Sequence, residues 1–220
     1  MAFQNNWNTS LFEFTQPLIH LLDAPLFSKT FTIECDLPGK YQNKNLKGVL
    51  VAAQILSTMG WKLTAPKVAK ALANVKKNTG LMGRWECIQD SPKLVLDVAH
   101  NAPGIIALLD QLEGIHYNQL HIVTGMVKDK DIDTVLNLLP INATYYYTQS
   151  HIPRALPANE LAEKGNALQR IGTHYENVNM ALATANKNAN PQDLILVIGS
   201  VFLVAEVDRN ITNPFDLSTL

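Results

Sequence analysis

Apolar and polar positions alternate along this chain of 220 residues in a pattern that changes from strand-like to helix-like and back. Short apolar runs predict buried strands at residues 94–98, 120–124, 144–148 and 194–198. Helical periodicity predicts helices at residues 104–112, 131–139, 158–169 and 178–186, with a further helix from Phe202. A short strand at 85–88 and a segment around 173–175 complete this part. The alternation indicates an α/β fold with a Rossmann-like, mostly parallel sheet covered by helices on both faces.

The first eighty residues have a different pattern. Residues 31–36 alternate between apolar and polar, which predicts a strand with one wet face. A helix is expected from Asn45 to a C-terminal cap at Gly60, and a second from Ala65 to about Lys76, with Pro66 in its first turn.

Two segments of this first part, the residues before 30 and segment 62–77, carry no recognisable functional motif. The apolar side chains before residue 30, among them Phe12 and Leu18, need burial, but Pro17 and Pro25 interrupt any long element. We interpret the lysine-rich segment 62–77 as the solvated face of an amphipathic helix rather than as a binding patch.

The segment from Asn78 to Arg84, which contains two glycines, is typical of a flexible hinge. We therefore expect a small α/β unit at residues 1–80, a larger domain at 81–212 and a tail at 213–220.

The composition argues against several classes of protein, including proteins that bind duplex nucleic acid and proteins that span a membrane. The hydrophobic fraction of 47% and net charge of −1 describe a globular chain without a broad basic field, which argues against duplex nucleic acid as main partner. Cys35 and Cys87 lack metal-binding spacing and suit a reducing compartment. The most apolar stretch, residues 194–205, is too short to cross a membrane, and no signal peptide is evident, so we expect a cytoplasmic protein.

Polar side chains follow the first of the four apolar runs. Asp97, His100 and Asn101 come at its end, and Pro103 then stands where the first helical turn begins. In open α/β sheets, ligands bind beyond the carboxyl ends of the strands, where these side chains are expected. The alternative is that Asp97 and Asn101 only cap a helix.

The other runs also end in polar side chains. Lys128, Arg154 and Ser200 follow three of them, so all these groups could meet at one edge of the sheet and suit an anionic or zwitterionic ligand. Ser200 could instead be an N-cap and Arg154 part of a surface ion pair. The six histidines lack the spacing of a zinc site, and no metal site is expected in this chain.

Several motifs resemble those of the Mur ligase superfamily. Residues 83–86 (GRWE) and 96–103 (LDVAHNAP) resemble its G-R-x-E and L-D-x-A-H-N-P patterns. Within the superfamily the similarity is greatest to the folylpolyglutamate synthase/dihydrofolate synthase family. Residues 37–45 resemble its L-x-G-x-x-Q-x-x-N segment, 151–155 its P-R-A loop and 197–204 its closing G-S strand and helix.

The resemblance implies a fold and an activity. The fold is a Mur ligase C-terminal domain preceded by a remnant of the central ATPase domain. The activity is ATP-dependent addition of L-glutamate to dihydropteroate or folyl(poly)glutamate through an acyl phosphate, with Mg²⁺. By position, Asn45, Arg84 and Asp97 would contact the nucleotide, and Asp97, His100, Ser200 and Arg154 the glutamate, with His100 and Asp97 as the catalytic pair.

The same resemblance implies a missing part. The family's N-terminal domain holds the phosphates with a P-loop and carries the metal ligands, but no G-x-x-x-x-G-K-[ST] motif occurs in these 220 residues. We therefore expect the chain to need an N-terminal P-loop domain in cis or in trans and to be inactive alone. Two alternatives stay open: a non-catalytic nucleotide-binding or interaction module, and a fragment of another Mur-type amino-acid ligase.

Overall fold

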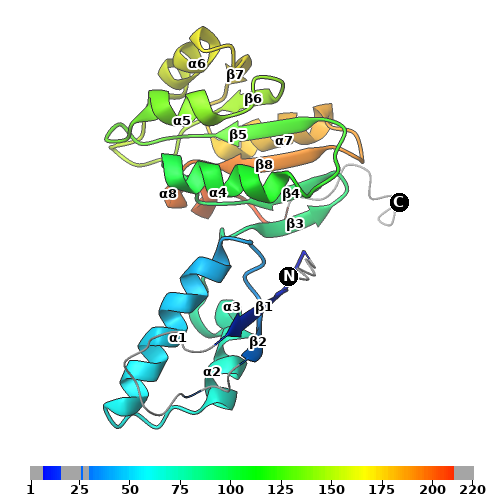
Figure 1. Ribbon diagram of the computed structural model, residues 1–220. Helices are drawn as coiled ribbons and strands as arrows, with labels where there is room; N and C mark the ends of the chain where they lie inside the picture. Colours follow the sequence, from blue (N-terminus) through cyan, green and yellow to red (C-terminus); the bar gives the residue numbers. More distant parts are fainter. Residues whose placement is uncertain (1–6, 16–25, 27–29, 211–220) are drawn as a thin grey trace. The chain divides into compact units, whose positions relative to one another are not determined.

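The structure, a computed structural model, describes residues 7–15, 26 and 30–210. It divides into two compact units, Met1–Arg84 and Trp85–Leu220, which are described separately (Figure 1). The expected apolar segment around Leu18, with its two prolines, lies outside the described residues, as does the expected tail at 213–220. The functional assignment of the expected domains stays a prediction.

The first unit is a two-stranded antiparallel sheet with helices on one face. Strands β1 (Ser10–Thr15) and β2 (Thr30–Cys35) pair, and the helices are α1 (Gln42–Thr58), α2 (Ala65–Leu72) and α3 (Val75–Thr79). The core joins the sheet to α1 and α2 through Phe12, Ile33, Cys35, Leu46, Leu50, Ala53, Val68 and Leu72. Strand β2 alternates between buried and exposed positions, as its pattern predicted. Strand β1 was not predicted, although Leu11, Phe12 and Glu13 also alternate between exposed and buried.

Helix α1 is apolar on more of its circumference than this core covers. It begins at Gln42, three residues before the expected start, and Gly60 follows its end with a positive φ of 93°. One face buries Leu46 and Leu50. A second face exposes Val49 (46%), Leu56 (36%) and Met59 (71%). The periodicity of the sequence could not separate the two faces, because residues of both are apolar.

The helix expected at residues 65–76 is two helices. Pro66 lies in the first turn of α2, as predicted, but the chain leaves the helix after Leu72 and starts α3 at Val75. The cause is Asp36, at the end of β2, whose carboxylate accepts hydrogen bonds from the backbone N–H of Val75 (3.0 Å) and Lys76 (2.9 Å). These two bonds cap α3 and fix the bend.

The second unit contains a six-stranded sheet. Its order is β3-β4-β8-β5-β6-β7, and only β3 runs antiparallel to its neighbour. The strands are β3 (Glu86–Asp90), β4 (Lys93–Leu96), β5 (Leu120–Thr124), β6 (Thr144–Tyr147), β7 (Gly172–His174) and β8 (Leu194–Ile198). The predicted α/β class and mostly parallel sheet are therefore confirmed.

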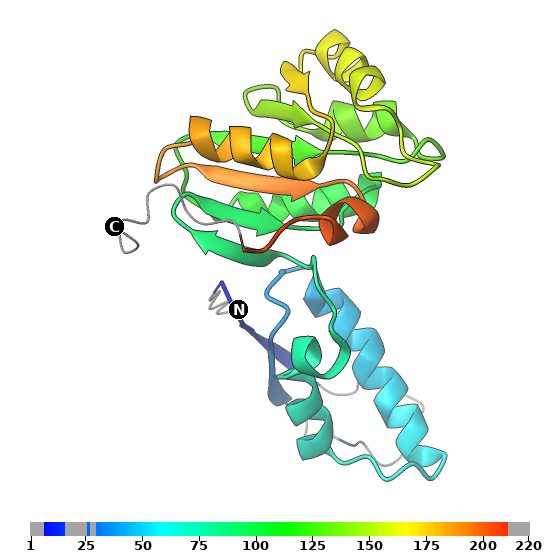
Figure 2. The ribbon, with the colours of Figure 1, turned by 180° about the vertical axis from the view of Figure 1, so that it is seen from behind.

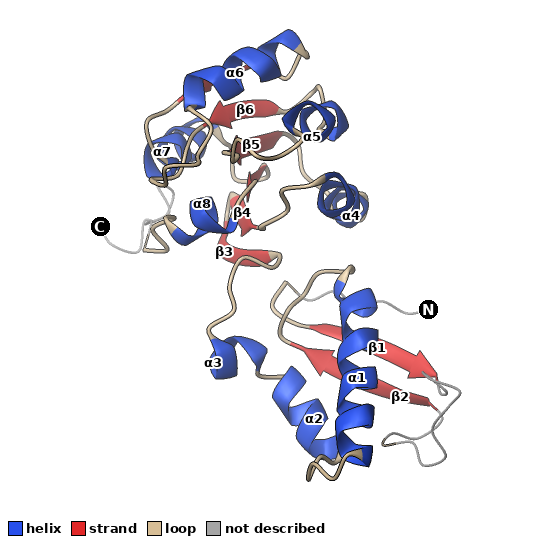
Figure 3. Cartoon of the chain, turned by 90° about the vertical axis from the view of Figure 1, so that its left-hand side faces the viewer, coloured by secondary structure: helices blue, strands red, loops and turns tan. Residues whose placement is uncertain are grey.

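Helices cover both faces of this sheet (Figure 3). They are α4 (Ala102–Leu112), α5 (Ile132–Leu138), α6 (Ala158–Ala167), α7 (Val178–Asn188) and α8 (Val201–Ala205). Helices α4 and α5 lie on one face, and α7 and α8 on the other, in front of the sheet in Figure 2. Strand β8 is buried throughout, because both of its faces are covered. No helix among the described residues combines the length and the apolarity needed to cross a bilayer.

Strand β6 places three tyrosines in this core. Tyr145 and Tyr147 stack on one face with ring centroids 5.7 Å apart, while Tyr146 packs on the other face against α7. A Cβ atom at Gly165 of α6 would lie 1.9 Å from the Tyr147 hydroxyl, so glycine lets α6 pack directly on β6. Burial raises the pKa of all three tyrosines.

Candidate functional site

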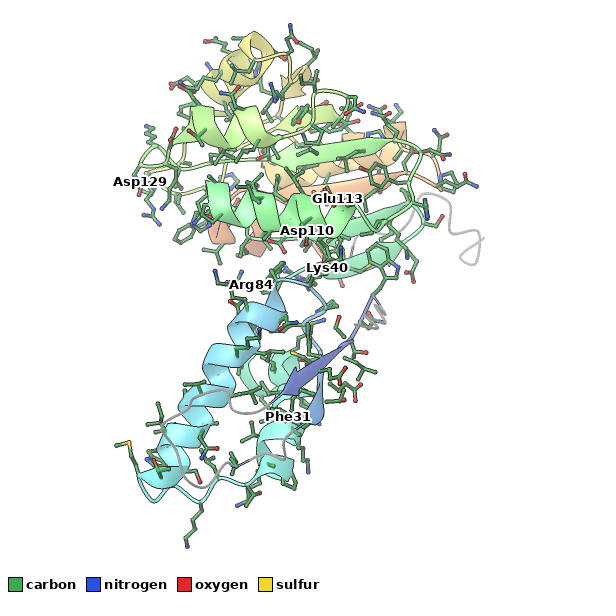
Figure 4. The ribbon with its side chains drawn as sticks, in the orientation of Figure 1. Phe31, Lys40, Arg84, Asp110, Glu113 and Asp129 are labelled. Atoms are coloured by element: carbon green, nitrogen blue, oxygen red, sulfur yellow. The ribbon has the colours of Figure 1, made fainter. Side chains whose placement is uncertain are left out.

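Four parallel strands bring the predicted polar groups to one edge of the sheet. Asp97 and His100 follow β4, and Ser200 follows β8. Lys128 comes after β5, and Arg154 after β6. Because these strands are parallel, their carboxyl ends share an edge. Asp129, beside Lys128, is labelled on the loop beyond β5 in Figure 4. We call this the carboxyl edge.

Asp97 is buried, with 4% of its surface exposed, and both of its carboxylate oxygens accept backbone hydrogen bonds. Oδ2 accepts from the N–H of Trp85 and Oδ1 from the N–H of Ala99, each at 2.9 Å. Trp85 has a φ of 51°, a left-handed conformation that is costly for a bulky residue. Asp97 therefore holds both the turn after β4 and the start of β3.

His100 presents one ring nitrogen to the carboxyl edge. Its Nδ1 lies 2.9 Å from the carbonyl oxygen of Val98. A carbonyl oxygen can only accept, so Nδ1 carries the proton in the neutral ring, and Nε2 holds a lone pair. Nε2 has no hydrogen-bond partner among the described residues, and the side chain is half-buried. The turn thus offers one oriented acceptor to a ligand.

The remainder of this turn is a helix cap. Asn101 is extended, and its Oδ1 accepts from the N–H of Gly104 at 2.9 Å, with Pro103 in the first turn of α4. The prediction that Asn101 caps this helix is confirmed.

Ser200 caps α8 in the same way. Its Oγ accepts from the N–H of Phe202 at 3.2 Å, and 6% of the residue is exposed. Gly199 before it has a φ of 125°, and a Cβ atom there would lie 2.2 Å from the carbonyl oxygen of Gly125. Only glycine fits this close approach of the segments after β8 and β5. The alternative interpretation of Ser200 as an N-cap is confirmed.

Arg154 joins three segments of the carboxyl edge. Its guanidinium carbon lies 5.0 Å from the ring centroid of Phe202 in α8, and its Nη1 lies 3.7 Å from Oδ2 of Asp129. Its carbonyl oxygen accepts from the N–H of Lys128 at 3.0 Å. Arg154 is thus in a surface ion pair, as the alternative interpretation had it, and also stacks beside the helix that Ser200 caps.

Glu206, which sequence reasoning missed, fixes the loop before Arg154. Its carboxylate accepts from the backbone N–H and from Nδ1 of His151, both at 2.7 Å. The two residues are 55 positions apart, and no sequence spacing could have indicated the pair.

The predicted nucleotide contacts in the first unit, Asn45 and Arg84, are accessible. Asn45 is exposed in the first turns of α1, and its Nδ2 donates to Oε1 of buried Gln42 at 2.9 Å. This bond explains the Q-x-x-N spacing, because residues three apart meet on a helix surface. Arg84 is half-buried, and within the part of the chain that the structure describes its guanidinium donates only to the carbonyl oxygen of Gly83, through Nη1 at 3.3 Å. Most of its N–H donors therefore face no described acceptor and suit an anion.

Metal ligands are not gathered in this part of the protein. Among the described residues, no three His, Cys, Asp or Glu side chains are placed to hold a metal ion.

Comparison with known protein families identifies the second unit. Residues 83–201 match the model of the Mur ligase glutamate ligase domain. The chain belongs to this family, and the resemblance expected from the sequence is confirmed.

Individual relatives and solved structures are similar to this chain over part of their length. The chain is 30% identical over 176 residues to the dihydrofolate synthase/folylpolyglutamate synthase of Buchnera aphidicola, covering 76% of this chain and 40% of that protein. The folylpolyglutamate synthase of Mycobacterium tuberculosis, solved with ADP and AMPPCP, has a TM-score of 0.67 at 25% identity over 80% of this chain and 41% of that one. A bifunctional folylpolyglutamate synthase/dihydrofolate synthase solved with Mn, AMPPNP and L-glutamate has a TM-score of 0.58 at 28% identity, covering 71% of this chain and 38% of that one.

The chain therefore spans about two fifths of the length of these relatives. The stretch of this chain that matches them is longer than the glutamate ligase domain at residues 83–201.

Proposed function

We propose that this chain is the glutamate-binding part of an ATP-dependent ligase that adds L-glutamate to dihydropteroate or to folyl(poly)glutamate. In such a reaction ATP phosphorylates the substrate carboxylate, the amine of L-glutamate attacks the acyl phosphate, and an amide forms with release of phosphate. The observation that carries the proposal is the family match over residues 83–201, which includes the whole turn around His100.

The carboxyl edge suits L-glutamate in its chemistry. Glutamate carries two carboxylates and an ammonium group, so a site for it needs cations and acceptors together. Arg154 provides a cation, and Nε2 of His100 an oriented acceptor for the ammonium or attacking amine. Ser200 lies at the same edge, where its buried hydroxyl holds α8.

Asp97 has a different role in this proposal. Both of its oxygens accept backbone bonds, so we assign it to positioning His100 rather than to direct proton transfer.

Asn45 and Arg84 would contact the nucleotide. Arg84 offers its fork of N–H donors to phosphate, and Asn45 an amide oriented by Gln42. Mg²⁺ would neutralise charge during phosphoryl transfer, with ligands supplied by another part of the enzyme.

That other part is the second half of the proposal. Turnover would require a polypeptide equivalent to the remaining length of the relatives, joined to this chain or supplied separately. The exposed apolar face of α1, with Val49, Leu56 and Met59, supports such a partner, because patches of this kind mark interaction surfaces.

A chimera tests the proposal. This chain would replace the matched 41% of the Mycobacterium tuberculosis synthase, and ADP release would be measured with Mg-ATP, L-glutamate and dihydropteroate or tetrahydrofolate. We expect no turnover by the chain alone and glutamate-dependent turnover by the chimera. His100→Ala should abolish turnover, while His116→Ala, at an exposed histidine near the opposite edge of the sheet, should not.

Two outcomes would contradict this assignment. Folate- and glutamate-dependent turnover by the chain alone, lost in Arg84→Ala, would mean that it needs no other part. Nucleotide binding by the chain without any glutamate-dependent turnover in the chimera would favour a non-catalytic module, and turnover with another amino acid would favour a different Mur-type ligase.

A further inference from the structure

Charge is divided very unequally between the two units. Residues 1–84 hold ten Lys and Arg against four Asp and Glu, whereas residues 85–220 hold eight against fifteen. The net charge of −1 conceals this division. Within the first unit, segment 62–77 contains five lysines and no acidic residue.

Part of this charge lines a concave surface. Lys67 and Lys70 of α2 and Lys77 of α3 surround a hollow of about 310 Å³ together with Ala71, Asn74 and Asn78. We call this surface the lysine hollow. It results from the bend between α2 and α3 that Asp36 fixes, because in one continuous helix these residues would form a straight convex stripe.

The lysines of the hollow have no acidic partner in the described part of the chain. Among the described residues, none of the three forms an ion pair, and Lys67 donates only to the carbonyl oxygen of Lys62, at 3.1 Å. Like charges that line one surface repel one another, so a bound anion would reduce this repulsion. Ordinary solvated lysines on a convex helix face do not enclose such a volume.

We propose that the lysine hollow binds the oligo-γ-glutamate tail of a folylpolyglutamate. This inference rests on the proposed function, whose product carries that tail. Each γ-linked residue leaves one free α-carboxylate and adds five backbone bonds, which spaces the carboxylates about 6 Å apart in an extended chain.

Lysines three residues apart on a helix, such as Lys67 and Lys70, have Cβ atoms about 5–6 Å apart, close to this spacing. The side-chain amide of Asn78 can donate to the carboxylates and to the amide carbonyls between them. Nδ2 of Asn74 already donates one hydrogen to the carbonyl oxygen of Lys70, at 2.9 Å, and carries a second for the ligand. The hollow therefore matches the tail in charge, repeat length and hydrogen bonding.

Binding to the purified chain of 220 residues tests the inference directly. The probe is a fluorescently labelled γ-linked glutamate pentapeptide, compared with the γ-linked dipeptide and the α-linked pentapeptide, with anisotropy as the readout. We expect the γ-linked pentapeptide to bind most tightly. Lys70→Ala/Lys77→Ala should weaken its binding about five- to tenfold, since each exposed ion pair contributes little alone.

The matched control removes the same charge elsewhere. Lys47→Ala/Lys187→Ala changes two other exposed lysines, one in each unit, and should leave the affinity unchanged within about twofold at physiological salt, where distant charges are screened. An equal loss in both double variants, or equal affinity for the α-linked peptide, would overturn the inference. So would tighter binding of a single-stranded oligonucleotide or of anionic phospholipid vesicles.

The chimera separates this inference from the proposed function. Turnover on a monoglutamyl substrate tests only the proposed function. If that turnover is present and Lys70→Ala/Lys77→Ala changes neither pentapeptide binding nor the KM for a pentaglutamyl substrate, the lysine hollow has no such role. If the hollow has this role, the KM rises for the long substrate and not for the short one.

Discussion

In the turn after β4, Asp97 holds the backbone, whereas His100 can contact a ligand. Both carboxylate oxygens of Asp97 accept hydrogen bonds, from the N–H groups of Trp85 and Ala99. In His100 only Nδ1 bonds to the carbonyl oxygen of Val98, and Nε2 faces no described partner. A motif in which both residues are present does not reveal this difference.

Asp97 and His100 should therefore differ in their effects on stability. In Asp97→Ala two N–H groups lose their acceptor in a buried turn, and the free energy of unfolding should fall by about 2–4 kcal/mol. His100→Ala removes a half-buried side chain with one hydrogen bond and should cost about 1 kcal/mol or less. Urea denaturation of the two variants gives the comparison, and equal stabilities would show that Asp97 does not hold the turn.

At the scale of helices and strands, the sequence of an element does not always determine which of its faces is buried. Helix α1 has one apolar face in the core and another that is exposed. Its own sequence supports both, so only the neighbouring elements decide which is buried.

Leu50 and Leu56 make a matched test of these two faces. Leu50 is fully buried, whereas 36% of Leu56 is exposed. Leu50→Ala should destabilise the chain by about 2–5 kcal/mol, because it leaves a cavity in the core. Leu56→Ala should cost less than about 1 kcal/mol in the chain alone.

The same pair can be measured by thermal unfolding of the chimera. If a partner polypeptide covers the second face, Leu56→Ala becomes distinctly more costly there than in the chain alone. An unchanged small cost in the chimera would remove the support that this face gives to the proposed partner.

At the scale of the whole molecule, both units bury weak acids. Burial raises the pKa of the Cys35 thiol in the first unit from 9.0, and of Tyr145, Tyr146 and Tyr147 in the second from 10.0. In the unfolded chain these groups ionise near their ordinary values, so above those values the unfolded state binds fewer protons than the folded state.

Stability should accordingly be constant with respect to these groups below pH 9 and fall as the pH rises above 9 to 10. Circular dichroism against pH, with phenolate absorbance recorded in parallel, measures this. We expect the three tyrosines of β6 to ionise only as the chain unfolds. Tyr147→Phe also removes the hydroxyl that donates to the carbonyl of Arg170, and it should reduce the alkaline slope. Ionisation of these three tyrosines while the circular dichroism still shows a folded protein would contradict the prediction.

The sequence by itself determined the elements whose signals are local. The strand at 120–124 and the cap at Asn101 needed only apolar periodicity and capping chemistry, both of which act within a few residues. Strand β1 also carried a local alternation, in Leu11, Phe12 and Glu13, but it was too short to stand out beside the prolines that follow.

Tertiary structure decided what depends on residues distant in the chain. The break between α2 and α3 is made by Asp36, some forty positions away, and the loop of His151 is held by Glu206. Local sequence specified which polar groups end each strand, and the parallel order of β4, β8, β5 and β6 brought them to one edge. Propensity and capping act over a few residues, whereas side-chain positions depend on long-range packing and on hydrogen bonds that no sequence spacing encodes.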